Sequence, residues 1–226
     1  MTQPTPIRRV RRPRLLDAFC CQGGASAGYE RAGFDVTGVD INPQPRYPYT
    51  FIQADAVAFI REYGADFDVV SASPPCQHDS ECQRIQGNAH PDLIGPTREA
   101  LESTGRPWVI ENVKGALPKL REPVMLCGAM FNMATYRHRY FEAGGGLTLT
   151  APQHPVHRAP QAKMGRPVPP GWYGQYVGNF SGVDQARHVM DVPWMNRDGI
   201  RECIPPAYSQ WIGNAFLARA RTAVAA

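Results

Sequence analysis

Arg14-Leu15-Leu16-Asp17-Ala18-Phe19-Cys20-Cys21-Gln22-Gly23-Gly24 is the stretch that decides the fold of this 226-residue chain. Its first six residues read as a short buried strand, and Cys20 to Gly24 form a tight turn that leads into a helix of small residues at about 25–32. The pattern then repeats, with strands at 35–39 and 51–54 and a helix at 56–63. Strands that alternate with helices at this spacing predict an α/β fold, with a parallel sheet covered by helices on both faces.

Polar and glycine residues follow the expected strands where each strand ends. Ligands of such sheets bind outside the carboxyl ends of the strands, so these residues predict a binding site at that edge. Asp40 could bind ribose hydroxyls and Asp55 could accept a hydrogen bond from an adenine amine. Each aspartate alone is more often a turn or cap residue. Together with Asp17, in order along one array, they favour an adenosine-type cofactor.

A candidate nucleophile lies in the run Ser73-Pro74-Pro75-Cys76-Gln77. A lone cysteine is usually a buried, inert thiol. Here the two prolines fix the backbone where a strand gives way to a loop, and a nucleophile needs that rigidity together with a lowered pKa. Glu111 ends another strand-like stretch, where it either caps the strand end or acts as a neutral acid that donates to a ring nitrogen.

Composition narrows the alternatives. The six cysteines contain no Cys-x-x-Cys pair, so we expect reduced thiols and no metal site. The chain has no apolar run of about 20 residues and no apolar segment after its basic N-terminus, from which we expect a cytoplasmic protein with no membrane span. Five arginines and no acid lie in residues 1–14, and residues 151–226 hold 8 basic and 4 acidic residues. These basic ends suit an anionic partner or a plain solvated surface, and charge alone does not decide between them.

Three further segments have a clear character. Residues 77–98 read as a polar loop, either a lid or an inert excursion. Residues 151–170 carry six of the 22 prolines, which predicts an extended connection with no fold of its own. The four-spaced stripe Ile212, Phe216 and Ala220 predicts a helix over about 207–221 that packs back on the body.

Five motifs in register resemble the cytosine-5 DNA methyltransferase family over most of the chain: 17–28, 73–77, 111–113, 135–139 and 210–215. The resemblance implies a Rossmann-like sheet that binds S-adenosylmethionine through Asp17, Phe19, Gly23, Gly24, Asp40, Ile41, Asp55, Pro75 and Asn214. It implies catalysis by Cys76, Glu111, Arg137 and Arg139. It divides the chain into a basic arm (1–13), a catalytic cofactor-binding domain (14–150), a small proline-rich target-recognition region (151–206) and a C-terminal helix (207–226).

The chemistry that the resemblance implies is methyl transfer to carbon 5 of a cytosine flipped out of double-stranded DNA. The Cys76 thiolate adds to carbon 6, carbon 5 then attacks the methyl group, Glu111 holds the N3 edge of the ring and Arg137 positions the base. The sequence departs from the family pattern at Cys21, usually a glycine, and at Thr135, usually a glutamine. Only 73 residues separate Arg139 from Gly213, so the recognition region is reduced.

Two other functions remain open at this stage. The same fold could act on a free cytosine nucleotide, or use a modified methionine-derived cofactor, as the short recognition region and Cys21 suggest. A catalytically silent DNA-binding protein is the alternative from another class. The compact chain suits a phage or bacterial enzyme, with or without a restriction partner. Neither the target sequence nor the oligomeric state follows from the residues.

Overall fold

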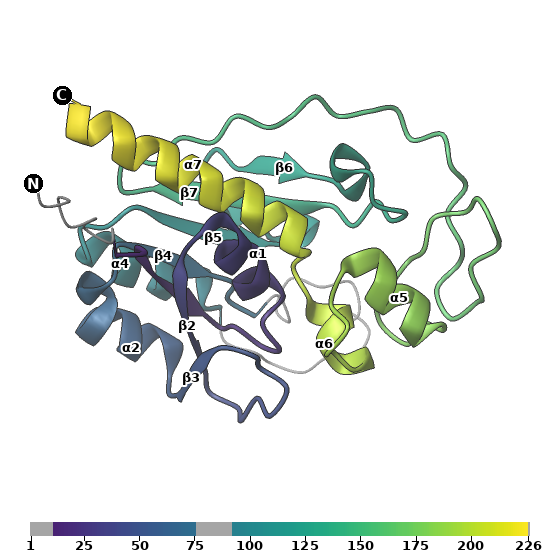
Figure 1. Cartoon of the computed structure of the whole chain (residues 1–226), viewed down its shortest axis with the longest axis horizontal. Helices are drawn as coiled ribbons and strands as arrows, with labels where there is room; N and C mark the ends of the chain where they lie inside the picture. Colours follow the sequence, from purple (N-terminus) through teal and green to yellow (C-terminus); the bar gives the residue numbers. More distant parts are fainter. Residues whose placement is uncertain (1–10, 76–91, 226) are drawn as a thin grey trace, which may run out of the picture.

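The computed structural model describes residues 11–75 and 92–225, without the side chains of residues 221–225. Its centre is a seven-stranded sheet in the order β3-β2-β1-β4-β5-β7-β6 (Figure 1). The strands are β1 (Arg14–Ala18), β2 (Asp35–Asp40), β3 (Thr50–Gln53), β4 (Val69–Ala72), β5 (Trp108–Asn112), β6 (Val124–Leu126) and β7 (Arg139–Gly144). The expected strands at the start of the chain are confirmed to within about one residue at each end.

Five strands run parallel, as the alternating pattern predicts, but the sheet is mixed. β7 pairs antiparallel with both β5 and β6. A parallel neighbour needs a crossover, usually a helix. The connection from β6 to β7 contains only the short 3-10 turn η3 (Gly128–Phe131), so the chain returns antiparallel instead.

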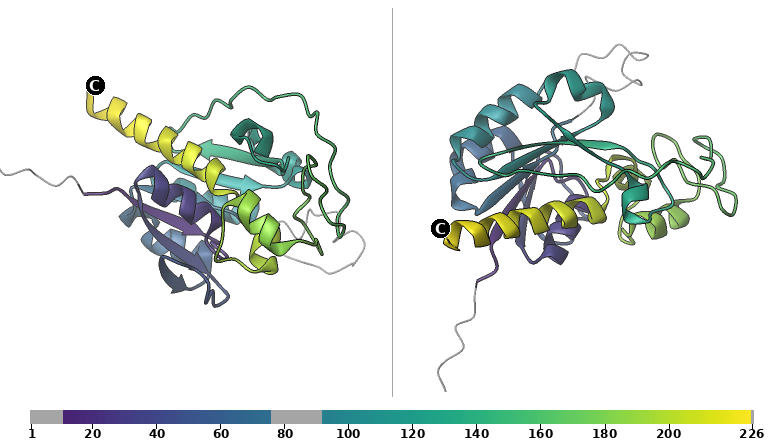
Figure 2. Two further views of the ribbon diagram at one scale, coloured as in Figure 1. Left: turned by 45° about the vertical axis from the view of Figure 1, so that its right-hand side comes forward. Right: turned by 90° about the horizontal axis from the view of Figure 1, so that it is seen from above.

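Helices cover both faces of the sheet, as expected. The described helices are α1 (Gly24–Ala32), α2 (Ala56–Tyr63), α4 (Ile94–Ser103), α5 (Val183–Met190), α6 (Arg197–Glu202) and α7 (Pro206–Ala225), with 3-10 turns η1 (Gly64–Asp66) and η2 (Lys114–Lys119). In Figure 2 the yellow α7 and α1 lie on one side of the strands, and α2 and α4 on the other. Successive strand residues point to opposite faces. Leu15 therefore packs under α1 and α7, and Leu16 under α2 and α4.

The C-terminal helix confirms its prediction and extends it to Ala225. Ile212 and Phe216 are buried against α1, but Ala220 is exposed, so the expected apolar stripe ends one turn early. The two helices approach very closely. A Cβ atom at Gly28 would overlap the Pro206 carbonyl oxygen and the Ser209 hydroxyl, so only glycine permits this packing.

The loop expected at 77–98 is only partly tested. Residues 77–91 lie outside the described part of the chain, and 94–98 form the first half of α4 rather than a loop. Residues 151–182, all of them described, contain no helix or strand beyond one isolated bridge between Gln161 and Tyr173, which confirms the expectation for the proline-rich segment. None of the described helices is long and apolar enough to cross a membrane.

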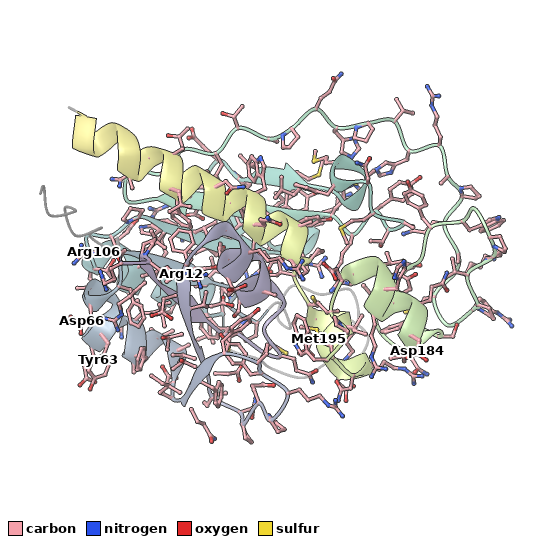
Figure 3. The ribbon with its side chains drawn as sticks, in the orientation of Figure 1. Arg12, Tyr63, Asp66, Arg106, Asp184 and Met195 are labelled. Atoms are coloured by element: carbon pink, nitrogen blue, oxygen red, sulfur yellow. The ribbon has the colours of Figure 1, made fainter. Side chains whose placement is uncertain are left out.

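The described arginines of the N-terminal arm have partners within the protein. Arg11 pairs with Asp68 at 3.1 Å, and Arg12 pairs with Glu30 at 3.2 Å. Both lie just before β1, at the amino ends of the parallel strands. Figure 3 shows Arg12 far from Met195, which lies at the other end of the sheet. These two arginines therefore lie away from the edge where the sequence predicts the site.

Candidate functional site

A pocket of about 280 Å³ lies at the carboxyl edge of the sheet, where the sequence predicts a ligand. The ends of β1, β2, β4 and β5 form its floor, and residues 195–204 close one side. Eight of the predicted site residues line it: Asp17, Phe19, Gly24, Asp40, Ile41, Pro75, Glu111 and Arg139. Cys76 lies outside the described residues, and the described chain breaks off at Pro75 in the pocket wall.

The turn after β1 has an unusual backbone. Phe19 and Cys21 have positive φ angles of 62° and 48°, a conformation that side chains other than glycine rarely adopt. This explains why glycine suits the position of Cys21. Gly24 is needed for a different reason, because a Cβ atom there would overlap the Cys203 sulfur and lie 2.6 Å from the Ile204 carbonyl oxygen. The atoms that approach Gly24 so closely therefore belong to Cys203 and Ile204 of the protein, rather than to a ligand.

Asp17 lies at the end of β1 and is almost completely buried. Burial raises the pKa of its carboxyl from 3.8 to about 7, although a 2.5 Å hydrogen bond from the Ser26 hydroxyl partly opposes that shift. Ser26 is also 2.8 Å from the Tyr47 hydroxyl. This chain of groups ties the pocket floor to α1 and to the connection between β2 and β3.

Asp40 and Asp55 differ in placement. Asp40 lines the pocket and accepts hydrogen bonds from the backbone N–H groups of Cys21 and Asn42, at 3.0 and 2.9 Å. Asp55 is the N-cap of α2, where its side chain accepts from the Ala58 N–H at 2.8 Å. It is absent from the pocket lining, so the structure gives it the cap role that a lone aspartate usually has.

The Glu-Asn-Val motif joins two strand ends. Asn112 is buried at the end of β5 and donates to the Pro74 carbonyl at 3.0 Å, and its own side-chain oxygen accepts from the Val113 N–H at 2.9 Å. This asparagine therefore fixes the Pro74-Pro75 turn against β5. Cys76, the candidate nucleophile, follows that turn directly in the sequence.

Glu111 and Arg139 form the charged centre of the pocket. The Arg139 Nε lies 2.9 Å from Glu111 Oε1, and both side chains are about nine-tenths buried. Apart from this ion pair, Glu111 Oε1 has no hydrogen-bond partner among the described residues, and the Ser73 hydroxyl lies beside the same carboxyl group. Burial raises the pKa of Glu111, and the charges of Arg139 and Arg137 act against that rise. The site thus holds a buried carboxyl group that is paired with a buried guanidinium.

Arg137 does not face the pocket, which corrects its expected role in contacting a base. Its buried guanidinium donates to the backbone carbonyls of Tyr176, Ile200, Arg201 and Cys203, at 2.8 to 3.1 Å. Burial lowers its pKa to about 10, which leaves it charged at neutral pH. Through these hydrogen bonds Arg137 holds Tyr176 and residues 200–203 against the start of β7.

Asn214, expected to bind the cofactor, does not line the pocket either. It lies inside α7 with its side chain exposed, and it is not part of the pocket lining. The neighbouring Gly213 packs against α1, where a Cβ atom would lie 2.7 Å from Ala32 Cβ. Gly23 is also missing from the lining, since Tyr47 packs against it. In this chain the Gly213-Asn214 motif serves helix packing.

Sequence reasoning missed the segment that closes the pocket. Asn196, the N-cap of α6, accepts from the Gln22 side chain at 2.8 Å, and the Trp194 indole N–H donates to the Gln22 carbonyl at 2.7 Å. Glu202 accepts from the Cys21 thiol at 3.4 Å, and burial raises the pKa of that thiol to about 12. No motif marks these contacts. The only available signal was that a polar Gln22 stands in an otherwise small-residue turn.

A larger cavity of about 840 Å³ lies beyond the edge formed by β5, β6 and β7. Its lining includes Arg106, Arg121 and Glu142, but none of the predicted site residues. We place the functional site in the smaller pocket, because the buried carboxyl groups and the proline turn converge there.

Comparison with known proteins supports the architecture. No protein-family model matches this sequence, and no curated protein matches it either. The methyltransferase EhMeth of Entamoeba histolytica superposes with a TM-score of 0.58 at 10% identity, covering 93% of this chain and 99% of that one. The chain has a methyltransferase fold.

Two further matches are more partial. The Dnmt2 methyltransferase of S. pombe has a TM-score of 0.42 at 20% identity over 59% of this chain and 49% of its own. The DNMT2 of Spodoptera frugiperda has the same TM-score and identity over 63% and 53%. The alignments thus span about half of each Dnmt2 chain.

Proposed function

We propose that this protein is an S-adenosylmethionine-dependent methyltransferase that modifies carbon 5 of cytosine in DNA, with Cys76 as the nucleophile. The observation that carries the proposal is the meeting of Pro74-Pro75, Glu111 and Arg139 in one pocket at the carboxyl edge of a methyltransferase-type sheet. The order of the motifs along the chain supports the choice of cytosine.

The β1–β2 side of the pocket suits the cofactor. Asp40 keeps lone pairs for ribose hydroxyls beyond its two backbone donors, and Phe19 and Ile41 offer apolar surface next to it. Ile41 is 63% exposed, which is the arrangement expected of a side chain that covers one face of an adenine ring. The bound cofactor supplies an electrophilic methyl group. Asp55 does not take part in this arrangement.

The β4–β5 side suits the base. Glu111 Oε1 is buried and, apart from its ion pair with Arg139, has no hydrogen-bond partner among the described residues, so a cytosine edge that presents an N–H group would supply one. A raised pKa favours the protonated carboxyl, which would itself donate to the ring nitrogen N3. Arg139 holds this carboxyl in place through their ion pair.

Cys76 would add to carbon 6 and make carbon 5 nucleophilic, since cytosine alone does not attack a methyl donor there. After transfer, loss of the carbon 5 proton releases the thiol. Asn112 contributes indirectly by fixing the turn before Cys76. The addition step therefore depends on the support that Asn112 gives to this turn.

The proline-rich segment is the part of the surface best suited to a phosphate backbone. No acidic residue occurs between Glu142 and Asp184, whereas Arg158, Lys163 and Arg166 are all exposed in that interval. Trp172 is 42% exposed on the same segment. Exposed cations together with an aromatic side chain are the usual means of holding DNA and a displaced base.

Nucleoside mass spectrometry would test the proposal. Genomic DNA is taken from a host without cytosine modification that expresses wild type, Cys76→Ala or, as a matched control, Cys82→Ala. We expect 5-methylcytosine with wild type and Cys82→Ala, and a loss of at least about a thousandfold with Cys76→Ala, because nucleophilic addition has no substitute.

Other outcomes contradict particular parts of the proposal. A cytosine derivative heavier than 5-methylcytosine would indicate that the cofactor is a modified methionine derivative rather than S-adenosylmethionine. Methylation of free deoxycytidine monophosphate in the absence of DNA, with little dependence on salt, would indicate that the substrate is a nucleotide rather than DNA. Soluble wild-type protein that binds DNA but leaves every base unmodified would indicate a silent binder.

A further inference from the structure

Four side chains with metal-binding atoms meet outside the pocket: Cys127, His138, His154 and His157. One ligand atom from each lies within 4.8 Å of all the others. The Cys127 sulfur is 3.3 Å from His157 Nε2, and the rings of His138 and His157 have their centroids 5.1 Å apart. None of the four lines the pocket.

The four residues come from three segments, two of which are neighbours because Leu126 and Arg139 pair across β6 and β7. Cys127 directly follows β6, and His138 directly precedes β7. His154 and His157 belong to the proline-rich segment, which has no helix or strand to hold it in place. The rings of His138, His154 and His157 lie close together, with their centroids 4.8 to 5.7 Å apart.

The donor set is that of a closed zinc site. Zinc takes thiolate and imidazole ligands in a tetrahedron, with bonds of about 2.3 Å to sulfur and about 2.0–2.1 Å to nitrogen. The edges of such a tetrahedron are roughly 3.3–3.8 Å long. The Cys127–His157 distance already has this value, and the rest would reach it through side-chain movements of about an ångström. Calcium and magnesium prefer oxygen ligands, which this cluster lacks.

We propose that Cys127, His138, His154 and His157 bind a structural zinc ion that fastens the proline-rich segment to the β6–β7 edge of the sheet. Four protein ligands leave no open position, so the ion would be structural rather than catalytic. It would also fix the backbone on either side of His138, where Arg137 clamps the C-terminal segment and Arg139 pairs with Glu111. The proposal does not depend on the methyltransferase assignment.

The sequence did not predict this cluster, because the expectation of no metal site rests on the absence of a Cys-x-x-Cys pair. The single local signal is the spacing His154-x-x-His157, and neither of its partners is close in sequence. A structure with one thiolate and three imidazoles from three segments satisfies the same coordination rule without any cysteine pair. The expectation of no metal site rests on the cysteine spacing alone and stays a prediction.

An alternative is that the cluster is held by stacking and hydrogen bonding alone. Tyr136 stacks on His157 with the ring centroids 3.5 Å apart, and its hydroxyl donates to the Ala159 carbonyl at 2.7 Å. These contacts position His157 whether or not a metal is bound. The two explanations differ in metal content, which can be measured directly.

The test uses full-length protein without a histidine tag, purified without added metal or chelator and analysed by elemental mass spectrometry. We expect about one zinc per chain in wild type and less than about a tenth of that in Cys127→Ser and His157→Ala. His188→Ala is the matched control, since His188 is exposed on α5 away from the cluster, and it should keep the full content.

A second measurement covers variants that fail to fold. Wild-type protein is stripped of metal and titrated with Co²⁺, whose visible spectrum reports tetrahedral coordination and whose near-ultraviolet band reports a thiolate ligand. We expect both signals to saturate at one equivalent. Trypsin should cleave after Arg158 and Lys163 at least about tenfold faster in stripped protein than in reloaded protein. Wild-type protein that takes up neither Zn²⁺ nor Co²⁺, or trypsin rates that do not respond to metal, would overturn the proposal.

Discussion

Replacing Asp17 with asparagine should remove a pH dependence from the stability of the protein. Burial raises the carboxyl pKa from 3.8 in the unfolded chain to about 7 in the folded one. The folded state therefore holds this proton across the interval in which the unfolded state has lost it. Stability from this group is highest below pH 3.8 and falls as the pH rises, until the change is complete at about pH 7.

The magnitude follows from the size of the shift. Each unit of pKa difference corresponds to about 1.4 kcal/mol, and the folded carboxyl is itself half ionised at pH 7, so from pH 5 to pH 7 wild type should lose about 2 kcal/mol relative to Asp17→Asn. The variant cannot ionise, and its amide oxygen can still accept the hydrogen bond from Ser26. The comparison therefore isolates the charge and leaves the hydrogen bond in place.

Urea denaturation at pH 5, 6, 7 and 8 provides the measurement, with the free energy of unfolding of each protein extrapolated to water. Asp184→Asn is the control, because the side chain of Asp184 is 94% exposed. We expect the effect of this substitution on the free energy of unfolding not to vary with pH in this way. A difference between wild type and Asp17→Asn that stays within about 0.5 kcal/mol over the whole range would refute the reasoning.

Two other substitutions test how the site is held. Asn112→Ala should destabilise the protein by about 2–3 kcal/mol in urea, since it leaves the Pro74 carbonyl and the Val113 N–H without their partner, and it should lower methyl transfer more than cofactor affinity. An unchanged transfer rate in folded Asn112→Ala would show that the proline turn does not need this support. Gly28→Val should cost at least about 2 kcal/mol, because the added side chain overlaps the start of α7; unfolding curves that match wild type would mean that the helices can separate without loss.

The sheet was predictable because its elements follow local rules. Leu15 and Leu16 alternate between two cores, Asp55 caps α2 where the sequence expects a helix to start, and α1 begins in the glycine turn. Each of these features depends on residues within about four positions of one another. Strand ends on a parallel sheet then meet at one edge, so Asp17, Asp40 and Glu111 could be placed together before their contacts were known.

The incorrect and missed assignments all involve contacts between distant segments. Arg137 sits in a motif that suggests a base contact, yet its direction is decided by carbonyl groups more than 35 residues further along the chain. Asn214 was placed by motif alone, and helix packing directs it to solvent. The cluster of Cys127, His138, His154 and His157 likewise combines side chains from positions 127 to 157. Local pattern carries no information on which distant groups will meet a side chain.

The dependence of the pocket on Gln22 and its partners near residue 196 has a consequence for the way the protein is made. At a synthesis rate of about 5–20 residues per second, roughly 10–40 s pass between the appearance of β1 and that of the segment that closes over it. A ribosome-bound chain can build most of the sheet in that time, but its ligand site stays open on one side. The pocket of a newly made chain thus stays incomplete until translation is almost finished, and fragments that stop short of residue 204 would keep a sheet without a closed pocket.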